Sequence, residues 1–322
     1  MGLVWFLVRR ILTGIVVLWI VATGTFLLFF TRPVAVVARG LAGRSATPQV
    51  IAEVIRNLGL NLPLSEQYWH FLVQIVWHHN LGYSYYSQQA VTTIIAQDLP
   101  ITASVVVGGV VLWLIVGMCV GILSATRART LFDRTATLAV LAGYSMPTFV
   151  LGELLIIGVF LPLNEHGFDW IQTGYAGLST GVIPWMGHMI LPWVTVATVQ
   201  AAIYTRLSRG SLLDTMGEDY IRTARAKGLS ERRVILRHGL RAALTPVVSQ
   251  LGIDIGYFLG GVIVVEEVFS LPGLGFDSVQ AIETSNLPVI IGFVLVASVF
   301  VVVANIIVDM VYAVLDPRVR IA

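Results

Sequence analysis

The chain has 322 residues, 57% of them hydrophobic and only 12% charged, and its mean hydropathy of +0.84 lies well above that of soluble domains. This composition predicts an integral membrane protein. The net charge of +2 says little about partners, because the basic residues are segregated along the chain. The single cysteine, Cys119, excludes an intrachain disulfide and a thiolate metal cluster.

The first apolar run covers residues 11–30, which carry no charge and are long enough as a helix to cross the hydrocarbon core. Arg9 and Arg10 precede it. A cleaved signal peptide is the competing interpretation, but the run is too long and no small-residue cleavage site follows. We therefore expect a retained membrane anchor.

Residues 31–98 are more polar and predict two short amphipathic helices. The first should start at Thr47, followed by proline, and stop at Gly59. Ser65 can cap the second helix. We interpret this segment as a small helical cap outside the membrane.

Five further apolar runs have the length of membrane-spanning helices. They cover residues 101–125, 137–161, 189–204, 244–268 and 289–315. Together with the first run they predict an all-α membrane protein with six transmembrane helices. We expect residues 1–98 to hold the first helix and the cap, and residues 99–322 to form a five-helix core.

The basic residues predict the orientation. Sixteen of the twenty lie in four segments that share one side if six helices span the membrane. These are the two termini, the turn at 127–134 and the stretch at 206–241. Residues 162–188 and 269–288, on the other side, contain none. The positive-inside rule therefore predicts two cytoplasmic termini and a cytoplasmic loop at 206–246.

The most distinctive part of this loop covers residues 218–246 and reads EDYIRTARAKGLSERRVILRHGLRAALTP. Helix-favouring residues flank Gly228, which can turn the chain at an unusual φ without a steric penalty. Ser230 can cap a second helix. We expect a helix, a glycine turn and a helix, with Ala224 and Ala226 keeping one face thin enough to enter a cleft.

Several stretches resemble one family. The family is that of the dipeptide/oligopeptide permeases, the membrane subunits of ATP-binding-cassette importers. Residues 220–246 are similar to its ATPase-docking motif, and EEVFSLPGLG at 266–275 is similar to its signature after span five. Residues 80–84 and the Asp-Pro-Arg at 316–318 are similar to further landmarks. The resemblance covers essentially the whole chain and implies the permease fold.

The loop departs from the wider importer pattern of Glu-Ala-Ala, three residues and Gly. With Gly228 as the anchor, those positions hold Arg-Thr-Ala, which the peptide subfamily carries. The resemblance implies that an ATPase docks on this loop. The implied coupling residues are Arg222, Thr223, Ala224, Arg225, Ala226, Lys227, Gly228 and Leu229.

ATP is not expected to bind this chain. A P-loop needs Gly-Lys-Ser/Thr, whereas Lys227, the only lysine, is followed by Gly228. We expect no catalytic, metal-binding or cofactor residue here, with ATP and Mg held by partner subunits. The resemblance implies a second, homologous permease subunit, two ATP-binding subunits and an extracytoplasmic solute-binding protein. It places the complex at the cytoplasmic membrane of a prokaryote. No nucleic-acid partner is expected.

The turn after span five has two interpretations. Its composition predicts a tight turn and a short helix at 276–283, which an ordinary loop could also contain. The resemblance instead implies contact with the solute-binding protein and a gate at the outer mouth. The residues concerned are Pro272, Gly273, Leu274 and Gly275.

Two acids lie deep in predicted spans, Glu153 in the third and Asp254 in the fifth, and such acids are functional candidates by default. Small-residue stripes, at 252, 256 and 260 in span five and at 117 and 121 in span two, predict close helix packing. The first stripe directs Asp254 to the opposite face. Both acids could line a substrate path or make interhelical hydrogen bonds.

We therefore expect half of the translocation pathway of an ATP-driven peptide importer that works by alternating access. The alternatives are a secondary transporter or channel that couples ions through Asp254 and Glu153, and a related importer of nickel complexes or another small solute. A membrane-embedded enzyme is a third class. The absence of inverted repeats and the presence of the loop argue against the secondary transporter.

Overall fold

The computed structural model describes residues 3–43, 46–84 and 86–315. These are mostly helical; the strands found in them form one short antiparallel hairpin of β1 (Tyr83–Ser84) and β2 (Gln89–Ala90). The all-α prediction is confirmed. The Asp-Pro-Arg landmark at 316–318 lies outside the described residues.

The chain forms two compact units. One comprises residues 4–102 and 272–303, and the other contains residues 103–271 together with the chain from 304 onward. The predicted cap therefore belongs to a unit that also includes the turn after span five, which the sequence analysis did not anticipate.

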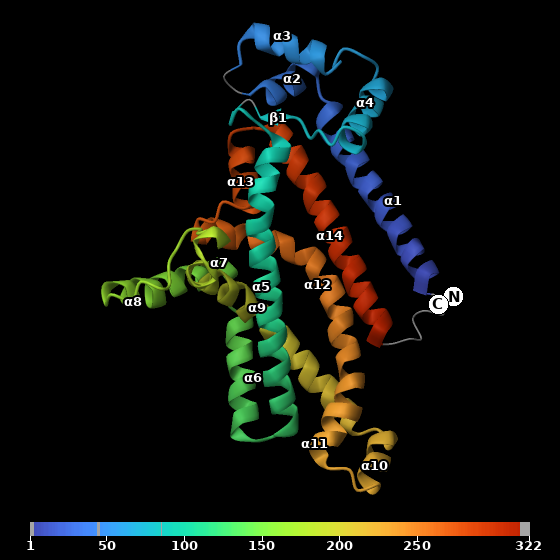
Figure 1. Ribbon diagram of the computed structural model, residues 1–322, viewed down its shortest axis with the longest axis vertical. Helices are drawn as coiled ribbons and strands as arrows, with labels where there is room; N and C mark the ends of the chain where they lie inside the picture. Colours follow the sequence, from blue (N-terminus) through green and yellow to red (C-terminus); the bar gives the residue numbers. More distant parts are fainter. Residues whose placement is uncertain (1–2, 44–45, 85, 316–322) are drawn as a thin grey trace. The chain divides into compact units, whose positions relative to one another are not determined.

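The first unit begins with α1 (Leu3–Phe30), which contains the first predicted span (Figure 1). Its other elements are α2 (Val34–Ala42), α3 (Pro48–Asn57), α4 (Leu64–Val76), the hairpin, the start of α5 (Val91–Thr126), α13 (Leu274–Glu283) and the larger part of α14 (Leu287–Leu315). Buried side chains of α2 pack with Val54 of α3 and with Leu60. The Val-rich helix α2 was not predicted from the sequence.

Of the two N-cap residues predicted for the cap helices, one is confirmed and the other is wrong. Thr47 caps α3 as expected, and its Oγ1 accepts a hydrogen bond from the Val50 amide at 3.4 Å. The prediction for Ser65 was wrong, because α4 begins at Leu64 and its N-cap residue is Pro63. The φ of Pro63 is −55°, close to the value that the proline ring fixes, and it suits the position before a helix.

The second unit is built around the long helix α9 (Val182–Met216), which packs against α6, α7 and α12. The elements of this unit are the rest of α5, α6 (Leu131–Tyr144), α7 (Thr148–Leu155), the π-helical η1 (Ile156–Phe160), α8 (Leu161–Glu165), the 3-10 turn η2 (Leu178–Thr180), α9, α10 (Asp219–Ala226), α11 (Glu231–Arg233), the π-helical η3 (Val234–Gly239), α12 (Leu240–Phe269) and the end of α14.

The predicted third span, 137–161, is not one continuous helix. α6 ends at Tyr144 and α7 starts at Thr148, directly after Pro147. Proline disfavours helical backbone in the residue before it, which explains the break. Continuous helix instead runs from Thr148 to Glu165.

By length and apolarity, five helical stretches in the described residues could cross a membrane. They are Trp5–Phe30, Val91–Thr126, Thr148–Glu165, Val182–Met216 and Leu287–Val311. The predicted fifth span, 244–268, lies within α12, a helix of 30 residues. The hydropathy pattern thus located the long helices, whereas their ends lie up to a few turns from the predicted ones.

Glycines set the distance between α5 and α9. A Cβ atom at Gly117 would lie 2.6 Å from Cβ of Tyr204, and one at Gly121 would lie 2.7 Å from the carbonyl oxygen of Thr205. Only glycine allows these backbones to approach so closely. In the other stripe, a Cβ atom at Gly252 would lie 3.2 Å from Val308 of α14. The contacts of residues 256 and 260 lie outside the described part of the structure.

Candidate functional site

The cationic loop joins the end of α9 to the start of α12 (Figure 1). The predicted helix, glycine turn and helix are present as α10 and α11, with the turn between them. The second helix differs from the prediction, because it passes through η3 directly into α12. No proline interrupts this stretch before Pro246, which lies inside α12.

The loop has a small apolar core of its own. Ile221 and Ala224 of α10 are buried against Val234, with Met216 and Leu229 packed beside them. The expectation that Ala224 helps to form a thin outward face was therefore wrong, since only 6% of Ala224 is exposed. The spacing of residues 221 and 224, one helical turn apart, was the signal that could have identified this inner face.

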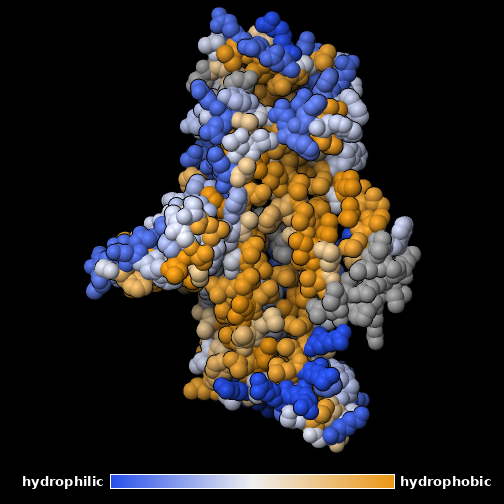
Figure 2. Space-filling view, viewed as in Figure 1, coloured by the Kyte–Doolittle hydropathy of each residue, from blue (hydrophilic) through white to orange (hydrophobic). Residues whose placement is uncertain are grey.

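The other coupling candidates, apart from the half-buried Leu229, are exposed. They are Arg222, Thr223, Arg225, Ala226, Lys227 and Gly228. With the basic residues of α11 they make the surface over α10 and α11 hydrophilic, whereas the helices leading to it present apolar side chains (Figure 2). The inner side of the loop is thus packed with apolar side chains, and its outer side is exposed and cationic.

Gly228 ends α10 in a left-handed conformation, with φ of +75°. Its amide donates to the Arg225 carbonyl at 2.9 Å, and the Leu229 amide donates to the Ala224 carbonyl at 3.4 Å. A Cβ atom at this position would have no neighbour within 4 Å. Glycine is required here by backbone conformation alone, and not by lack of space.

An ion pair closes the Gly228 turn from outside. The Arg225 guanidinium donates to both carboxylate oxygens of Glu231, at 3.1 and 2.7 Å, and this hydrogen bonding lowers the pKa of Glu231. Exposed pairs of this kind contribute about 0.2–1 kcal/mol. Ser230 occupies the predicted N-cap position of α11, but there its carbonyl, not its side chain, accepts the bonds from the following turn.

The two intramembrane acids lie in different surroundings. Asp254 is buried in α12 and accepts hydrogen bonds from the Tyr204 hydroxyl of α9 at 2.9 Å and from the Gln250 amide at 2.8 Å. Glu153 is exposed on α7. The contacts of Asp254 match one of the two interpretations left open by the sequence, an interhelical hydrogen bond.

The turn after span five leads into α13, which covers the predicted short helix. The Leu274 amide donates to Thr102 Oγ1 of α5 at 2.9 Å. Gly273, Leu274 and Gly275 are buried, whereas Pro272 is exposed. Of these four candidates for contact with a binding protein, Pro272 alone is on the surface of this chain.

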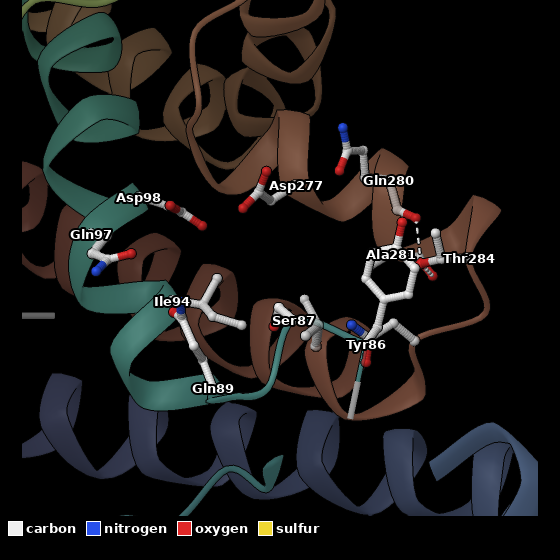
Figure 3. Close-up of a pocket in the computed structure, with 12 residues that line it drawn as sticks. Tyr86, Ser87, Gln89, Ile94, Gln97, Asp98, Asp277, Gln280, Ala281 and Thr284 are labelled. Atoms are coloured by element: carbon white, nitrogen blue, oxygen red, sulfur yellow. Dashed lines mark hydrogen bonds between the residues drawn. The ribbon is translucent and has the colours of Figure 1, made fainter. Parts of the chain in front are cut away.

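A pocket of about 240 Å³ lies beside α13 and was not anticipated (Figure 3). The carboxyl groups of Asp98 and Asp277 face each other in it. Burial raises the pKa of Asp277 above its ordinary value of 3.8. The two acids are far apart in sequence, so no local motif marks them.

Comparison with known proteins decides the family. A sequence profile described as "Binding-protein-dependent transport system inner membrane component" matches residues 117–321, and one for the N-terminal part of such membrane components matches residues 3–106. The chain belongs to this family. It is a multi-pass inner-membrane transport component and not an enzyme.

Full-length relatives agree with the profile. The permease is 40% identical over 315 residues to a glutathione transport system permease protein of Pectobacterium atrosepticum, with 98% of each chain covered. It is 38% identical to the corresponding protein of Escherichia coli K12, again over 98% of each chain. It is also 35% identical over 316 residues to a probable peptide ABC transporter permease protein of Sinorhizobium fredii, covering 98% of this chain and 99% of the relative.

The Tyr204–Asp254 contact gives a first prediction. In the permease, Asp254→Leu leaves the buried Tyr204 hydroxyl and the half-buried Gln250 side-chain amide without an acceptor, and an unsatisfied buried donor costs about 1–3 kcal/mol. If Tyr204 donates to Asp254, then Tyr204→Phe and Asp254→Leu will be non-additive in a double-mutant cycle, by about 0.5–3 kcal/mol. Unfolding of the purified variants in mixed micelles measures this. Additive effects would show that the two residues are not partners.

The Asp277 carboxyl gives a second prediction. Because its folded pKa is raised, its contribution to stability is complete below the ordinary value of 3.8 and is lost as pH rises through the folded pKa. The melting temperature of the permease in detergent should therefore fall between pH 4 and the folded pKa. Asp277→Asn should reduce this fall. An unchanged pH profile in the variant would contradict the assignment.

Proposed function

We propose that this permease forms half of the translocation pathway of an ATP-driven peptide importer, and that its α9–α12 loop is the docking site of an ATPase subunit. The observation that carries the proposal is the construction of that loop. Its inner face is closed by Ile221, Ala224 and Val234, while its outer face is cationic and exposed.

A short helix with its own core suits mechanical coupling. α10 is fixed to α11 and η3 on its inner side, so a push on its outer side displaces the loop as a unit. Separate ATPase subunits are required, because the sequence contains no P-loop. Closure of two such subunits around ATP would move the loops and switch the pathway between outward and inward access.

The orientation follows from charge. The basic residues cluster at the termini, the α5–α6 turn and the docking loop, which the positive-inside rule assigns to the cytoplasm. The cap and α13 then face the opposite side, where a solute-binding protein delivers cargo. Exposed Pro272, at the start of the α13 turn, is the proposed point of contact. A second, homologous permease subunit completes the pathway.

Peptides are the cargo favoured by the relatives. One similar permease is named for peptide transport and others for glutathione, which is itself a small peptide. Nickel complexes or another small solute remain the alternative within this family. Coupling of ions through Asp254 and Glu153 has no support, since Asp254 is engaged with Tyr204 and Glu153 is exposed on α7.

Gly228 provides a test of the docking site. In Gly228→Val a β-branched residue must adopt φ of +75°, which costs at least about 1–2 kcal/mol and distorts the end of α10. We expect ATPase co-purification and peptide uptake to fall in this variant. Gly228→Asn is the matched control, because asparagine tolerates this conformation. Normal uptake with normal ATPase association in Gly228→Val would refute the docking role.

Cargo is tested by competition in proteoliposomes that contain the complete transporter. Uptake of a labelled dipeptide should be reduced by excess unlabelled peptides and not by a nickel chelate. The permease purified without partners should hydrolyse no ATP above background. Competition by the chelate alone would replace peptide with metal complex as the cargo, and the docking site would be unaffected by that result.

A further inference from the structure

The helix α9, which leads into the docking loop, is joined to α6 by an ion pair. The Arg209 guanidinium of α9 donates through Nε to Asp133 Oδ1 at 2.7 Å and through Nη2 to Oδ2 at 2.8 Å. Such a two-point pair fixes direction as well as distance. The Asp133 side chain is only 7% exposed, and that of Arg209 is 31% exposed.

Asp133 also holds the α5–α6 connection. It accepts hydrogen bonds from the Ser124 hydroxyl of α5 and, at 2.8 Å, from the backbone amide of Arg129. Arg209, Ser124 and Arg129 together lower the pKa of Asp133 well below its ordinary range, so the carboxylate stays charged. One carboxylate thus connects α5, the turn, α6 and α9.

The helix backbones are in close contact beside this pair. A Cβ atom at Gly121 would lie 2.0 Å from Ser208 Oγ. The Ser208 hydroxyl is 2.6 Å from the Tyr204 carbonyl of its own helix and 3.2 Å from the Gly117 carbonyl of α5. A slide of α9 along α5 would lose these contacts. The ion pair opposes rotation of α9, and separation of the two helices would lose the close packing at the glycines.

The same end of α9 leads directly into the docking loop. Arg209 is followed by two helical turns that include Leu212, which packs with Ala125 of α5 and Ala243 of α12. α9 ends at Met216, a residue that also packs on the core of the loop. A displacement of α10 therefore reaches the ion pair through a few turns of packed helix.

We propose that Asp133 and Arg209 are positioning residues that make α9, α6 and the adjoining end of α5 move as one body with the docking loop. The pair transmits the displacement of the loop to the translocation helices and prevents its loss through bending of α9. The inference rests on the proposed docking function. Neither residue contacts cargo or nucleotide in this role.

The experiment compares Asp133→Asn and Arg209→Gln with the matched control Arg206→Gln, an exposed arginine on the same helix. Each variant is reconstituted in proteoliposomes with its ATPase subunits and binding protein. Peptide uptake and ATP hydrolysis are measured together. We expect both junction variants to keep their ATPase subunits and their hydrolysis, while uptake per ATP falls about tenfold. Arg206→Gln should keep the wild-type ratio, and Arg209→Lys, which keeps charge but loses the two-point geometry, should be intermediate.

The outcomes separate the two proposals. A wild-type ratio of uptake to hydrolysis in both junction variants overturns the inference, as does a loss of both activities in proportion to the amount of folded transporter. If the wild-type permease does not retain ATPase subunits when it is reconstituted with them, the docking function is overturned instead. If Asp133→Asn does not fold, Arg209→Lys still decides, because a wild-type ratio in that variant excludes a role for the two-point geometry.

Discussion

The contact between the backbones of α5 and α9 at Gly117 and Gly121 is the constraint on which the second unit depends. It brings Ser208 to the α5 backbone and places Arg209 within reach of Asp133. α9 can then serve as a common support for α6, α7 and α12. Larger side chains at either glycine would separate the helices, remove the two-point ion pair and leave Asp133 buried without its strongest partner.

The loop between α9 and α12, the proposed docking site, is also held by packing. A loop of this length between two spans would be mobile if it were only polar, yet Ile221, Ala224 and Val234 give it a core. Gly228 reverses the chain at no steric cost, and Arg225 and Glu231 close the reversal. The result is a small rigid body at the end of a long helix, which is what a force-transmitting contact needs.

Sequence patterns predicted what is local. Hydropathy located the long helices, and Gly228 located the turn that separates α10 from α11. The break at Pro147 was readable from the restriction that proline places on its neighbour, but the apolar run concealed it. The inward position of Ala224 was also readable, from its spacing of one helical turn from Ile221, but the residues against which it packs came from the fold.

The pairings between distant residues were out of reach of the sequence alone. Asp133 and Arg209 are 76 residues apart, and each taken separately resembles an ordinary charge at a helix end. Asp98 and Asp277 lie on different helices and meet only because α13 packs against the start of α5. The family resemblance suggested the function that we propose for the loop, whereas the connection of that loop to the bundle came from the fold.

The most direct test of this account is the distance between α6 and the end of α9 during the transport cycle. Spin labels at exposed Leu131 and Asp214, in a Cys119-free complete transporter, would report it without touching the docking residues. The account predicts one narrow distance distribution that is the same with and without bound ATP and that broadens in Arg209→Gln. A distribution that shifts between the two nucleotide states in the wild type would show that α9 moves independently of α6, and would contradict the central claim.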